Sequence, residues 1–294
     1  MSIEVHEDTA TRLRSHVALL ANGIGERSVW RAASLEAAAH YIGSQWRAMG
    51  YQVAAQPYST HGMLCRNLEI SIRGEDRPGE IVLVGAHYDS VRGSPGADDN
   101  ASGVAGLLEI ARMLYGTRMQ RTLKLVAFVN EEAPFFYFGE MGSKVYASAA
   151  RARGDDIRLM LSLEMLGCYS DAPGSQTYPP LLRLFYPSRG NFIAFVSNLR
   201  SRRALRETVD AFKAQCDFPC ESLASPEIVP GVSWSDQLSF WRAGYSGIMV
   251  TDTAFYRYPY YHTALDTPER LCYPEMARVV EGIARALTQL ARAR

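Results

Sequence analysis

The chain has 294 residues, of which 47% are hydrophobic, so it is long enough to bury a large core. Its 31 basic residues equal its 31 acidic residues, and this balance gives no indication of binding to nucleic acid or to an anionic membrane. No apolar run approaches the roughly 20 residues needed to cross a bilayer. We therefore expect a soluble protein with one domain over residues 1–294, because no Pro/Gly/Ser-rich linker divides the sequence.

The N-terminal sequence is polar and charged, and it lacks the apolar segment of a secretory signal. This favours a cytoplasmic location, and a secreted or periplasmic one if a leader has been removed. Five cysteines are too few for a disulfide scaffold. Only Cys216 and Cys220 are close enough in the sequence to bridge locally, and the sequence leaves open whether they do.

Helical and strand-like patterns alternate along the chain. Ser34 is expected to cap a helix that ends at Gly50, because apolar residues recur there at steps of three and four. Further helical patterns lie at about 101–115, 143–152, 199–215 and 275–293. Strands are predicted at 52–58, 67–72, 80–86, 122–129, 159–166, 191–196 and 247–251. This alternation predicts an α/β fold, a three-layer α/β/α sandwich, and residues 80–86 are apolar on both faces, as in a central strand.

Histidine and acidic side chains stand where the predicted strands end. They are His87 and Asp89 after 80–86, Glu131 and Glu132 after 122–129, and Glu164 near the end of 159–166; Asp99 and His262 lie in loops. Because open α/β sheets bind ligands at the carboxyl ends of their strands, we expect these residues to meet in one crevice. Each residue alone is more often a turn, cap or hydrogen-bonded side chain. The conjunction of separate segments at one edge favours a site.

Two imidazoles with several carboxylates are typical of a zinc site, because zinc accepts nitrogen and oxygen ligands. Calcium prefers oxygen ligands alone, and magnesium does not recruit two histidines. Manganese or cobalt would fit the same ligands. With this many carboxylates, one can bridge two ions and give the paired-metal arrangement of many hydrolases.

Several segments resemble the motifs of a known family. They are "HYDS" (87–90), "ADDNASG" (97–103), "NEE" (130–132), "SLEMLG" (162–167) and "YHTALDT" (261–267). In this order they look like the motifs of the two-zinc aminopeptidases of the MH clan, which are related to the glutaminyl cyclases. The similarity runs from about residue 60 to the C-terminus. It implies the zinc exopeptidase fold, with a mixed, mostly parallel sheet, two zinc ions per chain and a peptide or aminoacyl substrate; it leaves the oligomeric state open.

The resemblance also implies which residues bind the metals. Asp99 would bridge the two zinc ions, and the peptide bond after the corresponding aspartate is often cis in the family. The other ligands would be His87 and Glu164 on the first zinc and Glu132 and His262 on the second. Glu164 departs from the commonest family pattern, which has aspartate there.

Three further residues would serve catalysis. Asp89 would accept the second ring N–H of His87 and orient it. Glu131 would be the general base that takes a proton from water and later returns it to the leaving amine. The hydroxyl of Tyr261 would polarise the scissile carbonyl. The implied activity is that of a metal-dependent aminopeptidase that hydrolyses N-terminal peptide bonds.

Some features depart from the family or stay open. In "WSDQLSFWRAGYSG" (234–247), Gln237 stands where the family has histidine, and Asp236 is expected near the metal ligands. The aromatic run Phe135, Phe136, Tyr137 and Phe138 either lines a specificity pocket or packs on the core. Residues 175–192 and 216–220 are expected to be rim loops, and Arg189 could meet a substrate carboxylate.

Two other functions remain open from the sequence alone. A single-zinc glutaminyl cyclase would use Glu164 as an uncoordinated proton shuttle, although "DDNASG" looks more like the peptidases. A non-catalytic binding protein could keep the fold without its metals. The intact set of ligand-type residues argues against this second alternative.

Overall fold

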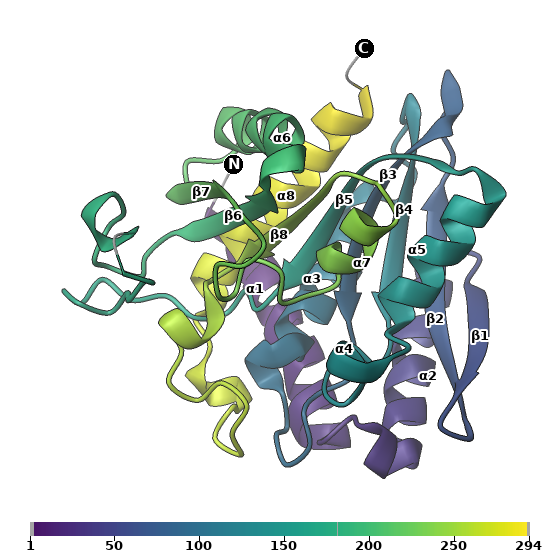
Figure 1. Cartoon of the computed structure of the whole chain (residues 1–294), viewed down its shortest axis with the longest axis horizontal. Coiled ribbons are helices and arrows are strands. Elements are labelled where there is room, and N and C mark those ends of the chain that lie inside the picture. The colour runs from purple at the N-terminus through teal and green to yellow at the C-terminus, as the bar shows by residue number, and fades with distance from the viewer. Residues whose placement is uncertain (1–2, 181, 293–294) are drawn as a thin grey trace.

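One mixed sheet runs through the structure, a computed structural model that describes residues 3–180 and 182–292 (Figure 1). Within these residues the sheet is eight-stranded, with the order β1-β2-β4-β3-β5-β8-β6-β7. The strands are β1 (Ala54–Thr60), β2 (Met63–Ile72), β3 (Arg77–His87), β4 (Arg121–Phe128), β5 (Asp156–Glu164), β6 (Ile193–Asn198), β7 (Cys220–Ser225) and β8 (Gly247–Thr251). The central strands β4, β3, β5 and β8 are parallel to one another. Antiparallel pairs occur at both sides, β1 with β2, β2 with β4, and β6 with β8.

Helices cover both faces of the sheet. They are α1 (Ile3–Ala18), α2 (Ala32–Ala48), α3 (Gly103–Leu114), α4 (Phe135–Phe138), α5 (Gly142–Arg153), α6 (Arg202–Gln215), α7 (Gln237–Arg242) and α8 (Tyr273–Arg292). Helices α1, α3, α6 and α8 pack together on one face, whereas α5 and α7 lie on the other (Figure 1). The predicted three-layer sandwich is therefore confirmed. Among the described helices, none is both long and apolar enough to cross a membrane.

Strand β3 contributes side chains to the cores on both faces of the sheet. Val82 and Val84 belong to the larger core, which also contains residues of α3 and α8. Leu83 points to the smaller core beneath α5, with Tyr146. Because alternate side chains of a strand face opposite ways, a strand buried on both faces is apolar throughout, as residues 80–86 predict.

The connections around β3 open a crevice at one edge of the sheet. The chain leaves β3 through α3 and enters β4 on one side of it. It then passes through α5 to β5 on the other side of β3. The loops after these parallel strands diverge at such a switch point, which is where open α/β sheets bind ligands.

Three local predictions differ from the structure. Helix α1 is absent from the predictions because polar residues such as Thr9 and His16 occupy buried positions on it, which obscures its apolar stripe. Residue Cys220 begins strand β7, where a rim loop is predicted; as an edge strand, β7 is only half-buried and has no apolar run to reveal it. Ser34 does not cap α2, because the helix already begins at Ala32 after a 3₁₀ turn.

Gly85 in β3 lies against the buried ring of Phe128, and a methyl group there would overlap that ring. The ring is held by Tyr146 and Phe240, so it cannot move aside. Gly85→Ala should lower the free energy of unfolding by about 1–3 kcal/mol. Urea denaturation measures this loss. Gly79→Ala, in the same strand with no atom within 4 Å of the added carbon, is the control and should have little effect; equal losses would contradict the prediction.

Candidate metal centre

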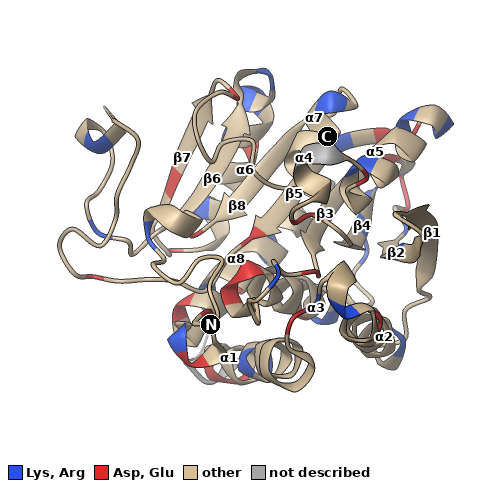
Figure 2. Cartoon of the chain, turned by 60° about the horizontal axis from the view of Figure 1, so that its bottom comes forward, with Lys and Arg blue, Asp and Glu red and all other residues tan. Residues whose placement is uncertain are grey.

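The predicted ligand-type residues lie at the carboxyl ends of adjacent parallel strands. His87 is the last residue of β3, and Glu164 is the last residue of β5. Glu131 and Glu132 follow β4 after two intervening residues, Val129 and Asn130. Figure 2 shows several Asp and Glu residues near these strand ends. The sheet topology thus brings together residues that are far apart in the sequence.

Non-glycine residues with positive φ occur at the site. Asn130 (φ 60°) precedes the glutamate pair, Met165 (φ 55°) follows Glu164, and His262 (φ 59°) is itself one of the expected ligands. Non-glycine residues seldom adopt this left-handed conformation, and when they do they often mark functional sites. The peptide bond between Asp99 and Asn100 is cis, as the family resemblance implies.

Two groups of side chains each bring three ligand atoms within 4.8 Å of one another, and Asp99 belongs to both groups. In the first, the Nε2 atom of His87 lies 3.4 Å from an oxygen of Asp99 and 3.4 Å from an oxygen of Glu164. In the second, the Nε2 atom of His262 lies 3.0 Å from the other oxygen of Asp99 and 3.4 Å from Glu132. We call these five residues the candidate metal centre.

The candidate metal centre fits divalent cations. His87 is fully buried, and among the described residues its Nε2 atom has no hydrogen-bond partner; neither has Oε1 of Glu132. Burial raises the pKa of Glu132 to about 7, with the charge of Asp99 contributing in the same direction. Burial likewise raises the pKa of Glu164. Buried carboxylates this close together need positive charge, and nitrogen with oxygen donors suits zinc.

Two aspartates hold the metal-centre loops through backbone amides. Asp89 accepts hydrogen bonds from the amides of Glu131 and Glu132, each at 3.1 Å. Asp266 accepts hydrogen bonds from the amides of Asp98 at 2.8 Å and Asp99 at 3.1 Å. Each carboxylate therefore positions a pair of residues that includes a member of the metal centre.

The predicted contact between Asp89 and His87 has a mixed geometry. The Nδ1 atom of His87 lies 3.5 Å from the carboxylate of Asp89 and 3.2 Å from its backbone oxygen. The main hydrogen bonds of the Asp89 carboxylate go instead to the two glutamate amides. Asp266 accepts hydrogen bonds from the Asp99 loop in the same way. It lies in the motif "YHTALDT", but the motif alone does not reveal this role.

Asn100 and Ser235 fix the end of β5. The side-chain oxygen of Asn100 accepts hydrogen bonds from the amides of Met165 and Gly103, and its NH₂ group donates to the carbonyl of Leu163. The hydroxyl of Ser235 donates to a carboxylate oxygen of Glu164 at 2.6 Å. Both chain neighbours of Glu164, Leu163 and Met165, thus form hydrogen bonds with Asn100, which follows Asp99.

Glu131 lies beside the candidate metal centre but belongs to neither ligand group. Its carboxylate is 4.0 Å from the Nε2 atom of His87. Burial raises its pKa well above the ordinary value; His87 opposes this shift, and Glu132 and Glu164 add to it. Glu131 therefore lies next to the two ligand groups and is a member of neither.

Asp236 and Gln237 lie beneath this region. Both are fully buried. Burial raises the pKa of Asp236 to about 7, and His87 is among the charges that lower it, so Asp236 lies close to the centre as expected. Gln237 donates hydrogen bonds to the carbonyl of Val232 and the sulfur of Met249, and it belongs to neither ligand group.

Tyr261 covers His262. The two rings are stacked, with centroids 3.7 Å apart and planes inclined by 20°. Burial raises the pKa of the Tyr261 hydroxyl, and the charges of Asp99 and Glu132 raise it further, so the hydroxyl stays a hydrogen-bond donor at neutral pH. The hydroxyl therefore lies near the carboxylates of the candidate metal centre.

A fully buried guanidinium, Arg27, lies behind the centre. It donates hydrogen bonds to five backbone carbonyls, those of Leu20, Gly25, Tyr88, Pro95 and Gly96. Burial lowers its pKa to about 10, and the nearby carboxylates oppose this shift, so it remains charged at neutral pH. The sequence alone does not reveal this role of Arg27, because a single arginine in a polar N-terminal segment forms no recognisable pattern.

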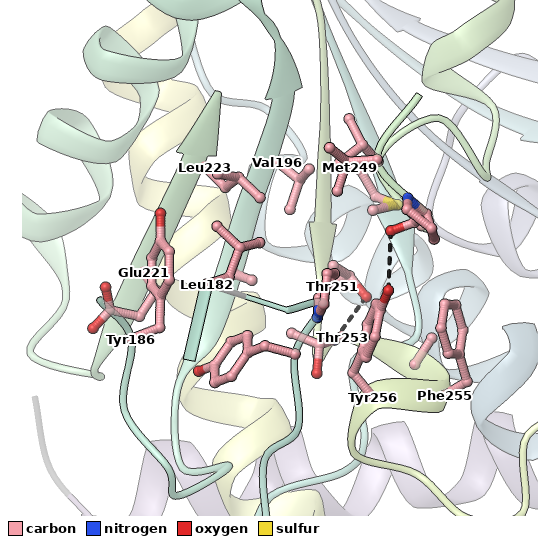
Figure 3. Close-up of a pocket in the computed structure, with 18 of the residues that line it drawn as sticks. Leu182, Tyr186, Val196, Glu221, Leu223, Met249, Thr251, Thr253, Phe255 and Tyr256 are labelled. Carbon is pink, nitrogen blue, oxygen red and sulfur yellow. Dashed lines mark hydrogen bonds between the residues drawn. The ribbon is translucent and has the colours of Figure 1, made fainter. Parts of the chain in front are cut away.

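An apolar pocket adjoins the metal centre (Figure 3). Glu164 belongs to the candidate metal centre and also lines the pocket. Tyr261 lines the pocket and lies beside the centre. Strands β6, β7 and β8 form its floor with residues such as Val196 and Met249, and the loop 175–192 contributes Tyr178 and Tyr186. This loop therefore does form a rim, as predicted.

Several other expectations have definite outcomes. Phe135 is buried in the main core and Phe136 packs against it, so these two rings pack on the core and do not line the pocket. The side chains of Tyr137 and Phe138 lie outside the described part of the structure. Arg189 is exposed on the rim loop. Cys216 and Cys220 are free thiols.

The comparisons with known proteins agree with this geometry. Residues 67–287 match the model of peptidase family M28. The chain belongs to this family. YfbL, an uncharacterized protein of Escherichia coli K12, is 39% identical to this M28 peptidase over 285 residues, which cover 94% of the chain and 87% of YfbL. The match to the family model confirms the predicted resemblance and the interpretation of the chain as a metallopeptidase of the aminopeptidase type.

Two further relatives are more distant from this M28 peptidase. The probable aminopeptidase YDR415C of Saccharomyces cerevisiae is 26% identical over 231 residues, which cover 73% of the chain but only 55% of the yeast protein. The structure of BSAP, a zinc aminopeptidase from Bacillus subtilis, superposes with a TM-score of 0.75 and 16% identity, covering 96% of this chain and 95% of BSAP. At that identity the likeness shows the fold alone.

The histidines of this M28 peptidase should make metal binding depend on pH. Burial opposes protonation of His262, but hydrogen bonds to Asp99 and Glu132 outweigh it and raise the pKa from 6.5 to about 11. Burial also opposes protonation of His87, yet Glu164, Asp89 and Asp99 raise its pKa well above 6.5. In the metal-free protein the pairing of His262 with Asp99 stabilises the fold fully below pH 6.5, and this contribution disappears as the pH rises through about 11.

Metals bind neutral imidazole, so zinc binding to the metal-free protein at pH 7 should release the histidine protons. Calorimetric titration in buffers of different ionisation enthalpy measures this release, and affinity should rise with pH. His262→Ala is the matched control and should release fewer protons. A binding enthalpy independent of the buffer would contradict the prediction.

Proposed function

We propose that this M28 peptidase is a two-metal aminopeptidase. His87, Asp99 and Glu164 would hold one ion, and Asp99, Glu132 and His262 would hold the other. The observation that carries the proposal is the position of Asp99, whose two oxygens face the two histidines separately. A carboxylate shared in this way is the arrangement expected of a bridging ligand.

Zinc is the ion that best suits this set of donors. A bound zinc ion acts as a Lewis acid towards a peptide carbonyl and makes water more acidic. The chain's own residues would orient the substrate and move the protons.

Glu131 would be the general base of the reaction. It is buried beside the ligands, and Asp89 fixes the backbone amides of both glutamates. Because the adjacent Glu132 is in the ligand group and Glu131 is not, the two side chains can divide metal binding and proton transfer between them. The raised pKa of Glu131 favours taking a proton from water and then holding it until the leaving amine accepts it.

The hydroxyl of Tyr261 would donate a hydrogen bond to the carbonyl oxygen of the scissile peptide. The hydroxyl remains protonated at neutral pH and lies near the carboxylates that would bind the metals. A donor aimed at the developing negative charge lowers the barrier more than it strengthens substrate binding. The stacking of Tyr261 on His262 would hold the Tyr261 ring in place beside the candidate metal centre.

The number of bound ions separates this proposal from its main alternative. Elemental analysis of the purified protein should find two zinc ions per chain, with anomalous scattering at His87 and at His262. A single ion, together with ammonia release from a peptide with N-terminal glutamine, would instead indicate a glutaminyl cyclase. No hydrolysis of a broad panel of aminoacyl substrates with zinc supplied would favour a binding protein.

Glu131→Gln should reduce hydrolysis of leucine p-nitroanilide by about 100-fold or more, since the proton acceptor is lost. The metal content should not change. Glu132→Gln is the matched variant at the neighbouring position, and it should lower the metal content as well. Near-normal turnover in Glu131→Gln would rule out its role as the base.

A further inference from the structure

Four side chains form one row across the floor of the pocket. Glu164 in β5 pairs with Thr251 in β8, Thr251 pairs with Ala194 in β6, and Ala194 pairs with Glu221 in β7. Paired residues of neighbouring strands point to the same face of the sheet. All four residues line the pocket, so the row joins the metal centre to β7 across two small side chains.

The rest of the pocket is largely apolar. Met249, Val196 and Leu223 form the next row of the floor, two residues further along each strand. Tyr178, Leu182 and Tyr186 reach over the floor from the rim loop. Figure 3 shows Glu221 and Tyr186 together at the β7 side, with Tyr256 and Phe255 at the opposite side. Among the described residues that line this pocket, Glu221 is the only acidic one apart from Glu164 of the candidate metal centre.

The surroundings of Glu221 leave its carboxylate open to a ligand. Within the described residues it has no ion pair at 4.0 Å or less, although Lys213 lies near enough to affect it. Burial raises the pKa of Glu221, and Lys213 opposes this shift. A cation inside the pocket would also favour the ionised carboxylate, because it would add a second positive charge near it.

We propose that Glu221 gives this pocket a preference for peptides whose N-terminal residue has a long aliphatic stem and a cationic end, that is, lysine or arginine. The inference rests on the proposed aminopeptidase function. The scissile bond would lie at the metal centre and the side chain would run over Thr251 and Ala194 towards Glu221.

The dimensions of the row agree with this assignment. Three strand spacings separate Glu164 from Glu221, or about 14 Å between their backbones. The carboxylates at the two ends shorten this span, and a lysine or arginine stem can lie along apolar side chains while its charged end reaches a polar group. Leucine or alanine would leave the β7 end of the pocket unfilled.

The test compares lysine, arginine, norleucine, leucine and alanine p-nitroanilides with the zinc-loaded protein. Norleucine has a straight aliphatic stem without the charge. We expect kcat/KM for lysine and arginine to exceed that for norleucine. Glu221→Gln should lower the lysine and arginine values by about tenfold and change the norleucine value by less than about twofold. Asp217→Asn is the matched control, because this carboxylate pairs with Arg278 outside the pocket, and it should leave every ratio unchanged.

A second variant tests the path of the side chain. Ala194→Leu should lower kcat/KM for lysine, arginine and norleucine while sparing alanine, because the added bulk blocks the row between Thr251 and Glu221. Faster hydrolysis of norleucine and leucine than of lysine and arginine by the wild-type protein would overturn the inference alone. An equal effect of Glu221→Gln on all substrates would do the same. No hydrolysis of any substrate would overturn the proposed function as well.

Discussion

The repulsion between crowded carboxylates is the constraint that organises this structure. Glu131, Glu132, Glu164 and Asp99 are all buried at one edge of the sheet. Burying an unpaired charge is very costly in free energy. The other contacts of the fold must offset this cost, and positive groups must lie near the carboxylates. Backbone amides bound to Asp89 and Asp266, two imidazoles and the guanidinium of Arg27 provide part of that charge, and divalent cations would provide the rest.

The sheet topology makes this gathering possible. Because β3 lies between β4 and β5 and all three are parallel, their carboxyl ends deliver residues from distant parts of the chain to one crevice. The antiparallel strand β6 then extends the same sheet beyond β8. This extension carries the floor of the apolar pocket, so the reacting centre and the substrate side chain would rest on one continuous surface.

The sequence indicated the residues that cluster at the strand ends better than it indicated the outer elements, for a physical reason. Ligand-type residues such as His87 and Glu164 stand directly after strongly apolar strands, where a polar residue is conspicuous. Polar residues at buried positions interrupt the apolar stripe of α1, and β7 is only half-buried, so neither has a clear pattern. Asp266 and Arg27 act through hydrogen bonds to the backbone of distant segments. No local sequence pattern predicts which distant carbonyl or amide a side chain will contact.

Arg27 comes from the segment that precedes residue 67, where the match to the family model begins. Its guanidinium ties the turn at Leu20 and Gly25 to the loop at Pro95 and Gly96, just before the shared ligand Asp99. The N-terminal segment therefore helps to hold the loop that carries Asp99. A chimera that grafted this loop onto another peptidase of the family would need to import its cationic anchor too.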